Sequence, residues 1–262
     1  MKTVHLVFLI GALLPVSHTD QGRRNGFVEI FRDNFNSNGA PDPGKWKLEQ
    51  TTADAHFPGE RQVYRQENVA VENGLLHAYT KWEQYNGFKY TSGMVSTRGL
   101  FDFQYGELEW RAKVPDTEKI WGTVMLQNSQ CDPTVPCRDF PGKITTVISG
   151  DEARASIADY VKDRERPPPE MFEVYFISLP RDFSRNFHVF KITWTPEKVV
   201  WFVDDVAKWT ITGEAVPHVR MQVVMHNYAN RLVHNVPPAD AKFPSDFAID
   251  YVVVRQFNNS TG

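Results

Sequence analysis

The sequence has no strong excess of charge of either sign. Its 262 residues include 29 Lys and Arg and 32 Asp and Glu, which gives a net charge of −3. A mixed surface of this kind creates no broad field that would attract nucleic acid or acidic lipid. We therefore expect no nucleic-acid or membrane partner, and uncharged polysaccharides fit better as ligands.

Long apolar runs are missing outside the N-terminus. The run Val4–Val16 follows the positive charge of Lys2 and is too short to span a bilayer. Small or polar residues come next, with a candidate cleavage site after Thr19. The pattern predicts a signal peptide over residues 1–19 and a secreted, extracellular single domain over residues 20–262. A membrane anchor is the alternative interpretation of the same run.

Cysteine is scarce, with only Cys131 and Cys137 in the chain. Two cysteines without ordered histidine partners make a poor zinc site. In a secreted chain this close pair predicts a disulfide that closes the loop CDPTVPC. The tail FNNST contains glycosylation sequons at Asn258 and Asn259, where a glycan would decorate the surface.

Repeats of 20–50 residues are absent, which argues against a solenoid or propeller. Short runs rich in Val, Ile, Phe, Tyr and Trp recur instead, between Gly, Pro, Asn and Asp. This pattern predicts an all-β, antiparallel β-sandwich. The expected strands include residues 68–80 (turning at Asn73-Gly74), 108–114, 187–194, 199–203 with 208–211 (across Asp204-Asp205), and 247–257.

Two segments interrupt this rhythm. Residues 34–46 are polar and rich in Gly and Pro, and residues 162–171 (KDRERPPPEM) join a charge cluster to three prolines. Proline cannot donate a hydrogen bond to a strand ladder. We interpret the second segment as a loop or lid at one end of the sandwich, with a plain solvated loop as the alternative.

Several segments, in this order and spacing, resemble glycoside hydrolase family 16 of the β-1,3-glucanase and lichenase type. The resemblance covers about residues 27–257. It implies a concave, concanavalin A-like jelly roll that cleaves β-1,3, β-1,4 or mixed-linkage glucans and related galactans. The segments similar to family motifs are FRDNF (31–35), NVAVENGLL (68–76), YTSGMVST (90–97), YGELEWRAKVP (105–115), FHVFKITWTPEKVVWFVD (187–204) and IDYVVVRQF (249–257).

The family's active strand reads E-x-D-x-E, or E-x-D-x-x-E where a bulge adds a residue. Alternate residues of a strand face the same cleft, and retaining hydrolysis needs two carboxyl groups about 5–5.5 Å apart. The corresponding strand here is GKITTVISG (142–150). Lys143 takes the nucleophile position, Thr145 the middle position, and Val147 the acid/base position, or Ile148 if the strand is bulged. All three carboxylates are missing.

The chemical consequences of these replacements are severe. Lys143 cannot form a glycosyl ester, and its charge would oppose the positive charge that develops on the sugar ring. Val147 has no proton to donate, although general acid–base catalysis contributes typically about 10²–10⁴-fold. The sequence therefore predicts a pseudoenzyme that resembles catalytically inactive β-1,3-glucan recognition proteins.

Other acids keep an active enzyme open as an alternative. Asp139, Asp151 and Glu152 flank the strand and could be relocated catalytic groups, although turn positions are the simpler interpretation. Glu107 and Glu109 alternate on a neighbouring strand. For Glu109 we expect a structural ion pair with Arg111.

The resemblance also implies sugar-binding positions. Trp121 falls where the family places a cleft tryptophan, with a core position as the alternative. Gly93 and Met94 stand where the family has a short residue and a cleft arginine, so one polar contact is lost. The further candidates are Arg61 and Gln62 in GERQVY and Asn227 and Tyr228 in MHNYAN, whereas Trp194, Trp201 and Trp209 are expected in the core.

No cofactor is expected, apart from the structural calcium that many family members hold. The resemblance implies Asp250 as a ligand, with Glu29 and the Gly74 carbonyl as partners. We interpret His226 and His234 as surface residues and not as a metal pair. The sequence thus predicts a secreted, non-catalytic β-glucan-binding protein. The alternatives are a retaining endo-β-glucanase with relocated acids, or a structural or protein-binding role on the same scaffold.

Overall fold

The computed structural model describes residues 23–24, 26–51, 61–117, 119–134, 142–148, 153–158, 172–176, 183–229 and 241–257. Its only helices in these ranges are two short 3-10 turns, η1 (Gln66–Asn68) and η2 (Gly213–Ala215). No helix in the described part of the chain is long and apolar enough to cross a membrane. Several predictions fall outside it: the signal peptide, Cys137, Asp139, Asp151, Glu152, residues 162–171, His234, Asn258 and Asn259.

The larger sheet has eleven strands, antiparallel except where β4 pairs with β7. Its main path runs β16 (Val206–Thr212), β15 (Lys198–Val203), β14 (His188–Trp194), β9 (Gly106–Lys113), β18 (Ser245–Phe257), β6 (Leu75–Tyr85), β7 (Phe88–Ser92), β4 (Gln62–Tyr64). Off this path, β2 (Phe27–Asp33) pairs with β18, β1 (Arg23–Arg24) with β2, and β5 (Val69–Glu72) with β6.

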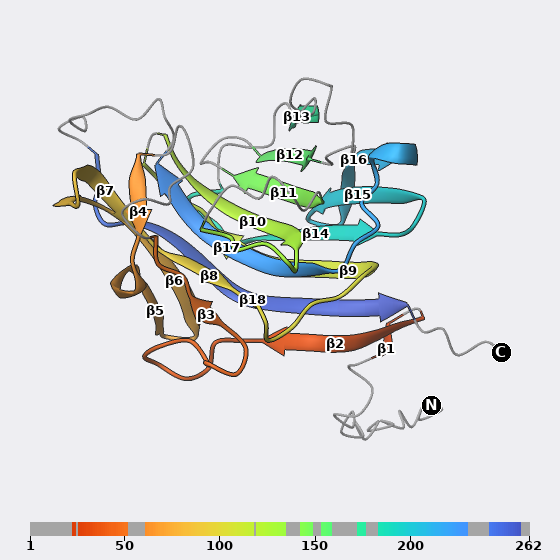
Figure 1. The fold of residues 1–262 in the computed structure, drawn as a ribbon, viewed down its shortest axis with the longest axis horizontal. Helices are drawn as coiled ribbons and strands as arrows, with labels where there is room; N and C mark the ends of the chain where they lie inside the picture. The colour runs from red at the N-terminus through yellow and green to blue at the C-terminus, as the bar shows by residue number, and fades with distance from the viewer. Residues whose placement is uncertain are drawn as a thin grey trace, which may run out of the picture.

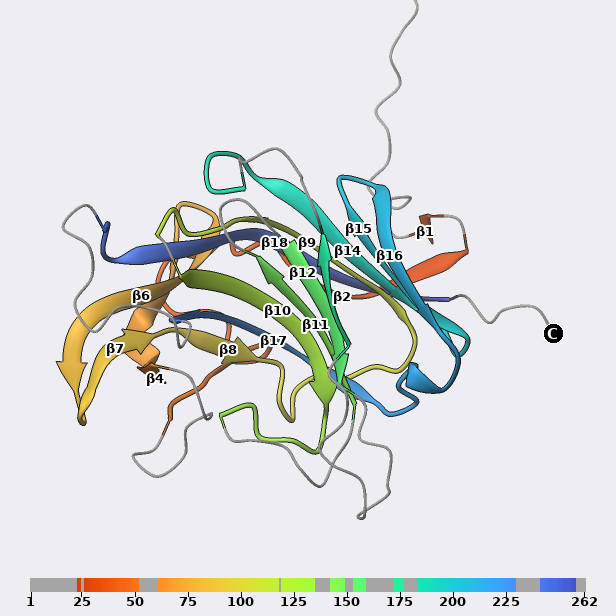
Figure 2. The same ribbon diagram turned by 90° about the horizontal axis from the view of Figure 1, so that it is seen from above.

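The smaller sheet has seven strands and lies over the larger one (Figure 1). Its order is β13 (Phe172–Phe176), β12 (Ala153–Ala158), β11 (Lys143–Ile148), β10 (Ile120–Asn128), β17 (Met221–Ala229), β8 (Met94–Ser96), β3 (Lys47–Leu48). Seen from above, the β6–β7 hairpin projects beyond the ends of β10 and β17 (Figure 2). The predicted β-sandwich is confirmed.

The core lies between the two sheets. In β9 every second residue is buried, so Leu108, Trp110 and Ala112 pack inward. Trp194 and Trp201 are buried in the same core, and Trp209 stacks on Trp201 with ring centroids 4.6 Å apart. The core positions predicted for Trp194 and Trp201 are therefore confirmed, whereas Trp209 is only partly buried and packs against the core from β16.

The sheets approach closely at Gly122 of β10. A Cβ atom there would lie 2.6 Å from the ring of Phe247, so only glycine fits. The two predicted turns are also present. Asn73-Gly74 and Asp204-Asp205 have positive φ at both residues, which suits two-residue hairpins. Residues 34–46 form the predicted loop, in which the Trp46 indole donates to Asp33 Oδ2 over 2.8 Å.

Candidate functional site

Strand β11 (Lys143–Ile148) carries the three positions that were predicted to replace the family's carboxylates. Its register with β10 runs without a break from Lys143–Gln127 to Ile148–Gly122, so no bulge shifts the alternation. Ile144 and Ile148 lie in the core between the sheets. Lys143, Thr145 and Val147 therefore face the opposite side, which we call the outer face of the seven-stranded sheet. Of the two residues predicted for the acid/base position, Val147 shares the face of Lys143 and Thr145, and Ile148 does not.

Neighbouring strands extend this outer face in rows of directly paired residues. Lys143 aligns with Gln127 and Gln222, Thr145 with Met125 and Val224, and Val147 with Thr123 and His226. Paired side chains across antiparallel strands lie about 4.5–5.5 Å apart at Cβ. On β11, β10 and β17 these rows contain no carboxylate.

One carboxylate residue lies farther along the middle row. Glu173 of β13 pairs with Ser156 of β12, which pairs with Thr145. At a strand spacing of about 4.8 Å, Glu173 lies roughly 10 Å from the Thr145 backbone. Sequence analysis missed this position because β12 and β13 were not predicted.

An apolar cluster covers the middle of the outer face. Tyr64, Met94, Met125 and Val224 are buried against one another, separate from the core between the sheets. Met94 therefore contributes to packing where the family has a polar contact. Gly93 leaves no room for a side chain, because a Cβ atom would lie 2.4 Å from the Asn68 carbonyl oxygen.

His226 belongs to a buried polar chain beside this cluster. It is only 6% exposed, so its predicted surface position is wrong. Burial and the charge of Lys143 lower the pKa of His226 to about 3, so the ring is neutral at pH 7. Gln62 Nε2 donates to the Tyr64 hydroxyl (2.9 Å), and that hydroxyl lies 2.9 Å from His226 Nδ1. Either the hydroxyl or Nδ1 can be the donor in this contact, according to the tautomer of the neutral ring.

The structure separates the predicted sugar-binding residues. Trp121 and Tyr228 are half-buried and lie together at one end of the outer face, edge to face with ring centroids 5.7 Å apart. Trp121 is thus not a core residue. Arg61 is exposed, whereas Gln62 is buried and accepts the Ala229 amide proton.

Asn227 was predicted to bind sugar, but the structure places its side chain away from the outer face. Its side chain lies between the sheets, where Nδ2 donates to the carbonyl oxygens of Ser245 (3.0 Å) and Ala78 (3.3 Å). It is fully buried and ties the two sheets together. Alternation along β17 places Asn227 inward because Tyr228 points outward.

Glu107 and Glu109 lie on the eleven-stranded sheet, facing away from β11. Arg255 Nη1 is 2.7 Å from Glu107 and 3.1 Å from Glu109, and the Tyr251 hydroxyl donates to Glu109. Burial and Glu109 raise the pKa of Tyr251 to about 12. The predicted Glu109–Arg111 pair is wrong. Because these acids are paired on the far side, they cannot serve the outer face.

The three predicted calcium ligands do not fit one site. Arg111 pairs with Asp250 (2.6 Å), and Arg32 binds both carboxylate oxygens of Glu29 (2.8 and 2.7 Å). Glu29 pairs in register with Arg255, five residues from Asp250 along β18, or roughly 15 Å. Calcium ligands lie about 2.3–2.6 Å from the ion. No group of three or more acidic, His or Cys residues suits a metal among the described residues.

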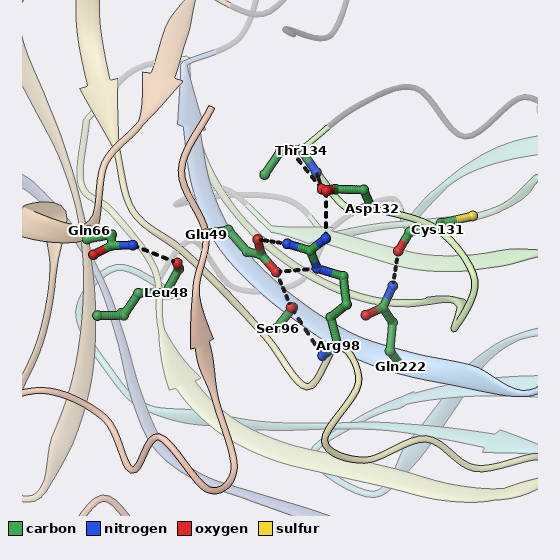
Figure 3. A network of polar contacts seen from close by, with 9 residues as sticks. All are labelled: Leu48, Glu49, Gln66, Ser96, Arg98, Cys131, Asp132, Thr134 and Gln222. Carbon is green, nitrogen blue, oxygen red and sulfur yellow. Dashed lines mark hydrogen bonds and ion pairs between the residues drawn. The ribbon is translucent and has the colours of Figure 1, made fainter. Parts of the chain in front are cut away.

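An ion network around the buried carboxylate of Glu49 borders the outer face and was not predicted (Figure 3). Glu49 is 3% exposed and binds the Arg98 guanidinium through both oxygens (2.7 and 3.0 Å), and Ser96 Oγ also donates to it. Arg98 reaches Asp132 at 2.6 Å. Burial by itself raises the pKa of Asp132. The hydrogen bonds from Thr134 and the charge of Arg98 outweigh burial, so the pKa is lowered.

This network holds the segment that carries Cys131 against the sheet. Gln222 Nε2 donates to the Cys131 carbonyl over 2.7 Å (Figure 3). Cys131 is buried, and because Cys137 lies outside the described residues, the disulfide stays a prediction. No sequence motif marks the network, since Glu49, Arg98 and Asp132 are far apart in the chain. Glu49 is a bound structural carboxylate and not a free acid.

Comparisons with known proteins agree with this fold. The family model "Glycosyl hydrolases family 16" matches residues 58–253. A β-glucanase of Rhodothermus marinus is 27% identical over 95% of this chain and 93% of its own length. A β-1,3-glucan-binding protein of Tenebrio molitor is 28% identical over 44% of this chain and 24% of its own length.

A solved structure supports the same assignment. The laminarinase of Rhodothermus marinus superposes with a TM-score of 0.73 and 25% identity, covering 88% of this chain and 98% of that one. The resemblance inferred from motifs is thus confirmed over most of the chain. Because the family model matches most of the chain and the jelly-roll sandwich superposes on a laminarinase, this chain belongs to glycoside hydrolase family 16.

Proposed function

We propose that this protein is a secreted, non-catalytic β-glucan-binding member of family 16. The observation that carries the proposal is the outer face of β11, where Lys143, Thr145 and Val147 stand in place of carboxylates. A retaining glycosidase needs one carboxylate as nucleophile and a second as acid/base. None of these three side chains can perform either role.

Two relatives support polymeric β-glucan as the ligand. One is a β-glucanase and another a β-1,3-glucan-binding protein, so both act on or bind the same class of polymer. The half-buried pair Trp121–Tyr228 offers an apolar ring surface for a pyranose. The near-neutral net charge of the chain suits an uncharged ligand. Secretion rests on the predicted signal peptide over residues 1–19.

Calorimetric titration of the purified protein with laminarin tests this proposal. We expect saturable heat after each injection and no release of reducing ends over hours. A Trp121→Ala variant should lose most of the heat, whereas Leu100→Ala, which truncates an exposed apolar residue, should behave as wild type. Sustained heat flow with new reducing ends would instead show turnover.

Turnover would revive the active-enzyme alternative. Asp151→Asn and Glu152→Gln would then identify which flanking acid is used. The second alternative, a structural or protein-binding role, is favoured by the apolar cluster of Tyr64, Met94, Met125 and Val224. Absence of heat with both laminarin and mixed-linkage glucan would support that role.

A further inference from the structure

We infer that the glucan site lies at one end of the outer face and continues past its rim onto Trp82 of the β6–β7 hairpin. This inference rests on the proposed function and deepens it, because it predicts a preference for long chains. It rests on the contrast between the buried side chains in the middle of the outer face and the partly exposed aromatic side chains at one end of it.

The middle of the outer face offers no open surface to a sugar ring. Thr145, Met125 and Val224 form the central row and are all buried, and Tyr64 and Met94 pack with the last two. A ring bound there would have to displace packed side chains, and such rearrangement of a well-packed interior is costly. Binding at the row that a hydrolase uses for catalysis is therefore disfavoured.

The end formed by Trp121 and Tyr228 differs from the middle. Both residues retain exposed surface, and the edge-to-face contact at 83° fixes the orientation of the two rings. Arg61, which precedes β4, is exposed and donates its amide proton to Ala229, the residue after Tyr228. An aromatic surface and a polar side chain therefore occur together at this end.

Trp82 lies next to this end and is 49% exposed. Along β6 it continues the face of Ala78 and Thr80, which are buried toward the seven-stranded sheet. It pairs in register with Tyr90, which packs with Ile120 and Ala229. Ile120 directly precedes Trp121 in β10, and Ala229 directly follows Tyr228 in β17. Figure 2 shows that the β6–β7 hairpin extends past the ends of those strands, which agrees with the exposure of Trp82.

The hairpin holds this tryptophan on an ordered support. Arg65 lies 4.2 Å over the Tyr85 ring and pairs with Glu83, which accepts the Thr91 hydroxyl proton at 2.6 Å. A preorganised aromatic side chain gives contact area at low entropic cost. Single exposed apolar residues are common on protein surfaces. What sets Trp82 apart is its pairing with Tyr90, which packs under the end of β10 and β17 that carries Trp121 and Tyr228.

Chain length should therefore decide affinity. A short β-glucan oligosaccharide can cover the rings of Trp121 and Tyr228. Only a longer chain also reaches Trp82, where it gains one more stacking contact. The same geometry predicts that the contribution of Trp82 is absent for short ligands.

Titration of laminaritriose and laminarihexaose into four proteins tests this inference. The proteins are wild type, Trp82→Ala, Trp82→Tyr and Val206→Ala. Val206 is a matched control, because it is 55% exposed at a hairpin on the opposite edge of the same sheet. We expect Trp82→Ala to weaken hexaose binding about two- to tenfold and to leave triose binding unchanged. Trp82→Tyr should restore most of the affinity.

The outcomes separate this inference from the proposed function. Wild-type binding with no loss in Trp82→Ala overturns the inference and leaves the proposed function intact. Equal losses for both oligosaccharides also overturn it, because Trp82 would then belong to the short-chain site. Failure of wild type to bind either oligosaccharide or laminarin overturns both. Unchanged melting of Trp82→Ala excludes an effect on folding.

Discussion

At the residue scale, burial changes the chemistry of groups that look ordinary in the sequence. His226 lies under the apolar cluster, and its environment disfavours the charged form. His77 shows the opposite behaviour, because its hydrogen bond to Asp246 outweighs burial and raises its pKa. Two histidines of the same chain therefore influence stability in opposite directions as the pH changes.

The free energy of unfolding should depend on pH through the protonation of His226. Its pKa in the folded state is about 3, below the ordinary value of 6.5, so the unfolded chain binds more protons between these values. The contribution of a neutral His226 is present above about pH 6.5 and is lost as the pH falls toward 3. Denaturant unfolding at pH 4 to 7 should show a flatter profile in His226→Gln than in wild type. His218→Gln, at an exposed site, is the control; a parallel profile for His226→Gln and wild type would contradict the assignment.

At the element scale, the network of Glu49, Ser96, Arg98 and Asp132 connects β3, β8 and the segment after β10 (Figure 3). β3 has only two residues and β8 only three, so each forms few backbone hydrogen bonds with its neighbouring strands. A buried ion pair contributes little net stability over an apolar replacement of both partners, but loss of one partner leaves a buried charge.

Replacement of Arg98 should therefore be costly. Arg98→Met leaves the Glu49 carboxylate buried and unpaired, and we expect the free energy of unfolding to fall by about 3–5 kcal/mol. Arg220→Met removes a solvent-exposed pair with Asp102 and should cost about 0–1 kcal/mol. Urea titrations of both variants measure the difference. Similar values for the two would show that the network is not a structural clamp.

At the scale of the whole molecule, the near-neutral charge fits the proposed ligand. A net charge of −3 is spread over 61 charged residues of both signs, the sum of 29 and 32. Many of these charges are paired on the eleven-stranded sheet, as Arg255 and Arg111 show. Recognition of a neutral polymer by aromatic side chains does not depend on the long-range field.

Glucan binding should accordingly be insensitive to salt. Screening reduces only interactions between charges, so the affinity for laminarin should stay within about twofold between low and high ionic strength. Affinity electrophoresis or calorimetry over a sodium chloride series measures this directly. A steep decrease with salt would mean that Lys143 or Arg61 binds an anionic group of the ligand, and the neutral-glucan proposal would need revision.

Much of this protein follows from the sequence alone. Strands such as β9, β14 and β18, the two hairpin turns and the shared face of Lys143, Thr145 and Val147 were predictable, because period-two alternation and turn residues act locally. The residues that these side chains contact could not be predicted from the sequence. Glu109 binds Arg255, Asn227 joins the two sheets, and His226 is buried, each through strands distant in sequence. Local pattern determines which way a side chain points, but only the tertiary pairing of strands decides what it meets there.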